Sequence, residues 1–251
     1  MPSKFREWFE CCLKKNKGRR LEWAVLLGYL IEQEFCRTIE NGTPYAGGVF
    51  PLDRANLVDI HSGDPHQHLE PQLCYRLYRE VYETNGGILE VGGEPIWIVN
   101  LFVPNQLNIA KRSADILGLR TDGSLVVFEA KRADMGDSPF YALLEGLDYL
   151  SHLLVNANQQ SFLQGFEAWR ERQQTVPAGF ENVGVTFGET VRHSVIVLAP
   201  AAYYFKHMKD SKRMSQGWEW LSERLLPLKR VRLDYAISDF SSAPSILLPL
   251  K

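Results

Sequence analysis

The chain has 251 residues, of which 45% are hydrophobic and 23% are charged, so it is long enough for a buried core and is neither fibrous nor disordered in composition. Its 28 basic and 30 acidic residues give a net charge of -2, which excludes a protein that coats nucleic acid by bulk positive charge. The first residues are too charged for a signal peptide and no apolar run reaches the length of a membrane span, so we expect a cytoplasmic protein with no membrane partner.

The first part of the chain predicts two amphipathic helices separated by an irregular connection. Residues 21–40 place apolar side chains at four-residue steps along one face, and residues 69–83 repeat the pattern until an Asn-Gly-Gly triplet ends the helix. Residues 41–68 are rich in Gly, Pro, Asp and His and show no sustained period, which predicts a long loop. Such a loop either lines a functional site or wraps the surface.

The next part predicts strands. Residues 95–103, 113–120 and 124–131 are rich in β-branched and aromatic side chains, and the Thr-Asp-Gly segment between the last two predicts a hairpin. The later elements are expected as a helix from Pro139, a short helix within 156–190, a strand at 193–200, a helix at 215–226 and a strand at 231–238.

The order of these elements predicts an α/β fold. Residues 69–200 read as helix, three strands, helix and strand, and a mixed sheet follows because strands separated by a helix usually pair in parallel. We expect residues 1–68 to form an N-terminal helical extension and loop, and residues 201–251 to form a C-terminal α/β extension packed on this core.

The hairpin is expected to bring three charged side chains to one face of the sheet. If residues 121–123 form a three-residue loop, Asp115 lies opposite Glu129, and Lys131 shares their face because side chains alternate along a strand. A two-residue loop would shift the register by one residue and break this alignment.

Two carboxylates and an ammonium at the end of a strand are costly unless something uses their charge. Mg²⁺ would do so, because it binds carboxylates, waters and phosphate oxygens. Asp115 and Glu129 are the expected ligands, and the backbone carbonyl of Ala130 would add a neutral one. Such an ion polarises a phosphate and lowers the pKa of an attacking water. Lys131 would orient that water or stabilise the charge that develops.

The segment S-A-Asp115-I-L-G-L-R-T-D-G-S-L-V-V-F-Glu129-Ala130-Lys131 resembles the PD-(D/E)xK nuclease superfamily. Ala114 stands where that family often has proline. The resemblance implies a restriction-endonuclease-like core, Mg²⁺ or Mn²⁺ as the cofactor, and hydrolysis of phosphodiester bonds in nucleic acid, DNA rather than RNA, in defence, restriction or repair.

The resemblance also implies an acidic residue on the helix before the sheet. Glu70 is preferred over Glu80, because H-L-E-P-Q-L has the E-x-x-L form. Glu145 and Tyr149 have the spacing of the Q-x-x-x-Y element of some branches, with Glu in place of Gln. For this pair we expect instead a solvated Glu145 beside a half-buried Tyr149.

Several alternatives stay open. The charged triad is otherwise a cross-strand ion pair on a solvated sheet face, and the chain is otherwise a non-catalytic nucleic-acid-binding or assembly module with a nuclease-like fold, or a protein-interaction scaffold. A homodimer or a partner protein is left open. His61, His66 and His68 are either zinc ligands or surface histidines of a loop, the second being preferred.

Two groups of basic residues are either nucleic-acid contacts or solvated helix ends. The first comprises Lys14, Lys15, Lys17, Arg19 and Arg20, and the second comprises Lys206, Lys209, Lys212 and Arg213, beside the aromatic residues Tyr203, Tyr204 and Phe205. His193, within an apolar strand, is expected to be a buried and hydrogen-bonded histidine rather than a base.

Overall fold

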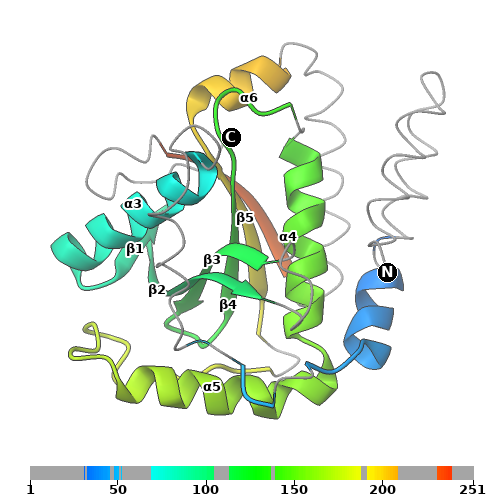
Figure 1. The fold of residues 1–251 in the computed structure, drawn as a ribbon, viewed down its shortest axis with the longest axis vertical. Coiled ribbons are helices and arrows are strands. Elements are labelled where there is room, and N and C mark those ends of the chain that lie inside the picture. The colour runs from blue at the N-terminus through cyan, green and yellow to red at the C-terminus, as the bar shows by residue number, and fades with distance from the viewer. Residues whose placement is uncertain are drawn as a thin grey trace.

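The computed structural model describes residues 31, 33–45, 48–50, 52, 69–104, 113–136, 139–187, 191–208 and 231–238. They form a mixed α/β arrangement of a six-stranded sheet with helices packed around it (Figure 1). The elements are α3 (Leu69–Asn85), β1 (Ile88–Val91), β2 (Glu94–Pro104), β3 (Ser113–Arg120), β4 (Leu125–Ala130), α4 (Pro139–Leu153), the 3-10 turn η2 (Asn156–Asn158), α5 (Gln159–Glu171), β5 (His193–Ala199), α6 (Ala201–Met208) and β6 (Val231–Ile237). Within these ranges, no helix has the length and apolar character needed to cross a bilayer.

The strands lie in the order of the sequence, from β1 to β6. Strands β1 to β4 pair antiparallel, whereas β4 with β5 and β5 with β6 pair parallel. The expected mixed sheet is confirmed. Because β4, β5 and β6 run in one direction, their carboxyl ends meet at the same end of the sheet.

The β3–β4 hairpin has the register that a three-residue loop predicts. Ile116 pairs with Phe128 and Leu119 pairs with Leu125, and the Arg120 N–H donates to the Ser124 carbonyl at 2.9 Å. Gly123 adopts a φ of 82° in the loop, a conformation that favours glycine. Continued by one residue, this register sets Asp115 opposite Glu129.

Two apolar layers cover the sheet. On one face, alternate side chains such as Leu125 and Val127 pack with α4 and α5, and on the other, Val126 and Phe128 pack with α3. Every residue of β4 and of β5 is buried. A charged side chain near the end of β4 is therefore held in a site from which most water is excluded.

Some predicted elements differ from the observed ones. Strand β1 was not predicted, because four residues are too few to show a period, and neither was α6, whose eight residues follow Pro200 directly. Residues 31 and 33–41 are helical, which agrees with part of the helix predicted at 21–40. The remainder of that helix, most of the loop at 41–68 with its three histidines, and the helix predicted at 215–226 lie outside the described residues.

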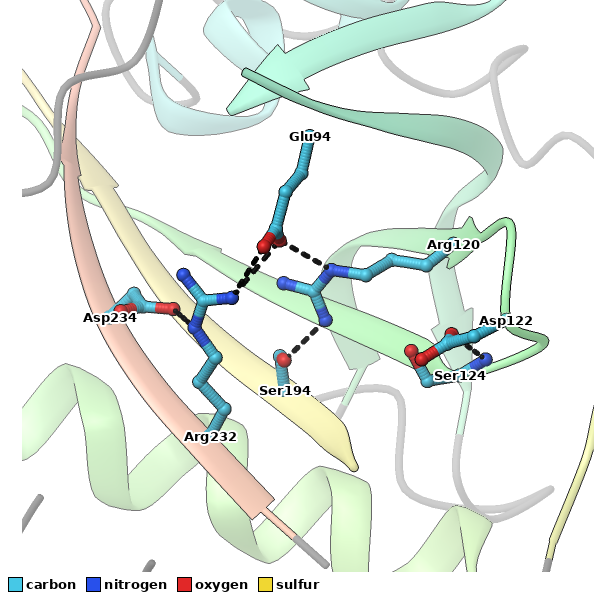
Figure 2. A network of polar contacts seen from close by, with 7 residues as sticks. All are labelled: Glu94, Arg120, Asp122, Ser124, Ser194, Arg232 and Asp234. Carbon is cyan, nitrogen blue, oxygen red and sulfur yellow. Dashed lines mark hydrogen bonds and ion pairs between the residues drawn. The ribbon is translucent and has the colours of Figure 1, made fainter. Parts of the chain in front are cut away.

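A polar network joins β2 to β6 at the end of the sheet opposite the carboxyl end of β4 (Figure 2). Glu94 accepts hydrogen bonds from Arg120 at 3.1 Å and from Arg232 at 2.8 Å. Arg232 also pairs with Asp234 at 2.7 Å, and Arg120 donates to the Ser194 hydroxyl. Four strand spacings separate β2 from β6, about 19 Å in a flat sheet. Direct contact between side chains of these strands therefore indicates a curled sheet.

Candidate active site

Five charged residues from four elements meet where β4 ends. Asp115 lies on β3 and Glu129 on β4, Lys131 follows β4 directly, Glu70 occupies the first turn of α3, and Glu145 lies on α4. The predicted triad is thus brought together, and so is the helix acid preferred from the sequence. Glu80 lies ten residues further along α3 than Glu70, about 15 Å along the helix axis.

The Lys131 ammonium is the centre of this group. Its Nζ lies 3.0 Å from Glu145 Oε2, 3.6 Å from Glu70 Oε1 and 3.7 Å from Glu129 Oε2. Its side chain is only 7% exposed, as is that of Glu129. Burial favours the neutral amine, but the surrounding carboxylates, Glu129 foremost, outweigh it and raise the pKa of Lys131 above its ordinary value. The ammonium is therefore charged at any physiological pH.

Asp115 and Glu129 form a pair of like charges on adjacent strands. Burial raises the pKa of Glu129 well above its ordinary value, and the charge of Asp115 raises it further. Burial also raises the pKa of Asp115, although the charge of Lys131 and the N–H of Ala130, 2.8 Å from Asp115 Oδ2, oppose this. Additional positive charge at this position would stabilise both carboxylates.

Glu70 supplies a prediction about pH. Burial, above all, raises the pKa of Glu70 to about 7 from 4.5. Where the pKa of a carboxyl group is higher in the folded than in the unfolded state, the free energy of unfolding of the protein falls as pH rises from the unfolded pKa through the folded one. In the unchanged protein, Glu70 should lower the free energy of unfolding by about 1–3 kcal/mol between pH 4.5 and pH 8. In Glu70→Gln this fall should be absent.

The measurement is urea unfolding in EDTA at pH 5 and pH 8. Glu80→Gln, on the same helix, is the matched control and should keep the pH dependence of the unchanged protein. An identical pH dependence for Glu70→Gln and the unchanged protein would contradict the prediction.

Glu145 corrects an expectation drawn from the sequence. It is not simply solvated, because it makes the shortest contact with Lys131, and its side chain is 38% exposed. Tyr149 is fully buried rather than half-buried, at 3% exposure, and its hydroxyl donates to the Val103 carbonyl on β2. Tyr149 thus attaches α4 to β2, and Glu145 attaches it to Lys131 at the end of β4.

Gly146 allows α4 to approach β4 this closely. A Cβ at this position would meet Val195 Cγ1, and it would lie 3.2 Å from Glu129 Cγ. An isolated glycine in an otherwise Leu-rich helix often marks such a close approach. The contact sets the distance between α4 and β4, and so the reach of Glu145 to Lys131.

A substitution at Gly146 tests this packing. Alanine normally favours a helix over glycine by about 1 kcal/mol, but here we expect Gly146→Ala to lower the free energy of unfolding by about 1–3 kcal/mol through overpacking. Urea unfolding measures it. Gly184→Ala is the control, since no heavy atom lies within 4 Å of a Cβ there. Stabilisation by Gly146→Ala would show that α4 does not press on Glu129.

The donor set at this position fits a hard divalent cation. It presents two carboxylates with excess negative charge, and Mg²⁺ is usually held by one or two carboxylates, with waters and substrate oxygens completing its shell. Within the described part of the chain, no group of three or more His, Cys, Asp and Glu side chains is arranged to hold a metal. Binding of a metal by Asp115 and Glu129, with the Ala130 carbonyl as a third ligand, stays a prediction.

His193 and two tryptophans of the core have structural roles. His193 is buried, and its Nδ1 accepts the N–H of Leu125 at 3.0 Å, as expected of a hydrogen-bonded core histidine. Trp97 and Trp169 are buried with ring centroids 4.7 Å apart, so they pack in the core. Neither finding adds a chemical group to the site.

No protein-family model matches the chain, and no curated protein or solved structure matches it either. The described residues form a mixed α/β protein in which four carboxylates surround one buried ammonium at the end of β4.

Proposed function

We propose that this chain is a metal-dependent phosphodiesterase that cleaves nucleic acid, DNA rather than RNA, with Mg²⁺ or Mn²⁺ as its cofactor. One observation carries the proposal. Asp115 and Glu129 face each other at the end of a buried strand, beside a buried Lys131, where carboxylates outnumber ammonium groups four to one.

The charge balance distinguishes this interpretation from an ion pair that only stabilises the fold. A stabilising buried pair gains most when its charges balance, because each uncompensated buried charge costs several kcal/mol. Here Glu129 and Lys131 are both 7% exposed, yet four carboxyl groups share the one ammonium. More acidic groups than one ammonium balances are expected of a site that takes up a cation.

The residues divide the chemistry among them. Asp115 and Glu129 would hold the divalent ion, which when bound polarises a phosphate and lowers the pKa of an attacking water. Lys131 is too buried and too strongly charged to act as a base. It would donate hydrogen bonds from a fixed position to the attacking water or to a phosphate oxygen. Glu145 and Glu70 would hold its ammonium in place.

The decisive experiment is cleavage of labelled double-stranded DNA, single-stranded DNA and RNA in EDTA, Mg²⁺ or Mn²⁺. The unchanged protein should cut only with metal, and Asp115→Asn should reduce the rate by on the order of 10²–10³-fold. Asp122→Asn is the matched control, because Asp122 lies in the loop of the same hairpin and caps the Ser124 N–H at 2.9 Å, a bond that asparagine keeps.

The alternative is a nucleic-acid-binding or assembly module that does no chemistry. Such a module would bind nucleic acid equally well in EDTA and in Mg²⁺, and Asp115→Asn would leave its function unchanged. A folded protein that cuts none of the three substrates with either metal would overturn the nuclease proposal in favour of this alternative.

A further inference from the structure

Helix α6 carries an exposed aromatic side chain that the site described above does not use. Three aromatic residues stand in a row on this helix, and the structure separates them. Tyr203 and Tyr204 are 0% and 2% exposed and belong to a small core cluster, whereas Phe205 is 67% exposed. Among the described residues, Val49 is the other large hydrophobic side chain with high exposure.

Phe205 lies at the end of the sheet that holds the candidate active site. Helix α6 follows β5, whose carboxyl end lies beside that of β4, and the Lys131 N–H donates to the Leu198 carbonyl at 2.9 Å. Lys206 Nζ donates to the carbonyls of Asp134 and Met135, each at 3.0 Å, in the loop that begins at Lys131. Figure 1 likewise places α6 at the end of the sheet where α4 begins. One short loop therefore connects the cluster to the surface that carries Phe205.

The acidic cluster favours such a surface beside it. In the metal-free protein the carboxyl groups around Lys131 disfavour a phosphate backbone, so positive groups next to the cluster would help to hold a nucleic acid. Phe205 is followed by Lys206, whose ammonium lies at this end of the sheet, against the loop that begins at Lys131. The other basic residues of this group, Lys209, Lys212 and Arg213, lie outside the described residues.

We infer that Phe205 is a stacking platform for an unpaired base of a single-stranded nucleic acid, with the positive charge of Lys206, which the Asp134 and Met135 carbonyls hold in place, beside it. The inference rests on the proposed function and adds its substrate class. An exposed aromatic ring next to basic residues is the pairing that single-strand-binding surfaces use, because every base has a face on which a ring can stack. In a duplex those faces are covered by neighbouring base pairs, so the same ring adds little to the affinity for duplex.

Binding can be measured separately from cleavage. The probe is a fluorescent oligothymidylate in EDTA, titrated by anisotropy against a hairpin duplex with the same label. Phe205→Ala should raise the dissociation constant for oligothymidylate by about 5- to 100-fold, the usual loss for one stacked base. Phe205→Ala should change the dissociation constant for the duplex by less than about 2-fold. Phe205→Tyr should restore binding and Phe205→Leu should not, which separates stacking from apolar contact.

Val49→Ala is the matched control. Its neighbours Gly48 and Phe50 hydrogen-bond to Ser161 on α5, at the opposite end of the sheet from α6 (Figure 1). Removing this exposed apolar side chain should leave both dissociation constants unchanged.

The outcomes separate this inference from the proposed function. If the unchanged protein cuts with metal but Phe205→Ala binds oligothymidylate as tightly, or loses duplex binding equally, the stacking role is overturned and the nuclease stands. If the unchanged protein never cuts while Phe205→Ala weakens single-strand binding alone, the nuclease proposal fails and the binding surface stands.

Discussion

Glu129→Gln is expected to abolish metal-dependent cleavage while making the metal-free protein more stable. Burial and the charge of Asp115 raise the pKa of Glu129 well above its ordinary value, so the ionised group destabilises the folded state at neutral pH. A neutral amide of the same shape removes that cost. We expect the free energy of unfolding in EDTA at pH 8 to rise by about 1–3 kcal/mol, and the cleavage rate to fall by on the order of 10²–10³-fold.

Urea unfolding and cleavage assays on the same preparations measure the two effects. Mg²⁺ should stabilise the unchanged protein and not the variant, because a ligand stabilises only the state that binds it. The sign of the pH effect is also fixed. Stability associated with Glu129 falls as pH rises above the unfolded pKa, so the gain should be smaller at pH 5 than at pH 8. Glu90→Gln, at an exposed position on β1, is the control. If Glu129→Gln instead destabilises the protein in EDTA, Glu129 is part of a stabilising ion pair.

The sequence predicts the half of the site that lies in one hairpin. Residues 121–123 determine the register, and the alternation of side chains along a strand then places Asp115, Glu129 and Lys131 together. The four apolar residues before Glu129 indicate a strand buried on both faces. These inferences need only neighbouring residues, which is why the sequence alone supports them.

The other half depends on how elements pack. The contact between Glu145 and Lys131 requires α4 to approach β4 at Gly146, and that approach depends on Val195, which lies far along the chain on β5. The glycine was the one local signal of it. The pairing of Glu94 with Arg232 joins residues 138 positions apart, and no local period predicts such a contact. Tertiary packing, and not propensity, determines these features.

Lys131→Met should destabilise the metal-free protein and abolish cleavage, and added metal should reverse the loss of stability but not the loss of cleavage. At pH 8 the loss of the ammonium leaves buried carboxylates, Glu129 above all, without a counter-charge, and we expect the free energy of unfolding to fall by about 2–4 kcal/mol. At pH 5 the loss should be smaller, because carboxyl groups with raised pKa values are then largely protonated. Mg²⁺ should restore stability without restoring cleavage, since charge neutralisation does not replace a fixed hydrogen-bond donor.

A double variant and a surface control make this result specific. Lys131→Met with Glu145→Gln should recover part of the lost stability, because one uncompensated charge is removed along with its partner, and it should stay inactive. Arg79→Met removes the cation of an exposed ion pair with Glu83 on α3, and it should cost at most about 1 kcal/mol. If Lys131→Met costs no more than Arg79→Met, the ammonium does not balance the cluster. If it also keeps full activity, Lys131 is not part of the chemistry, and the two carboxylates would have to act with a different group.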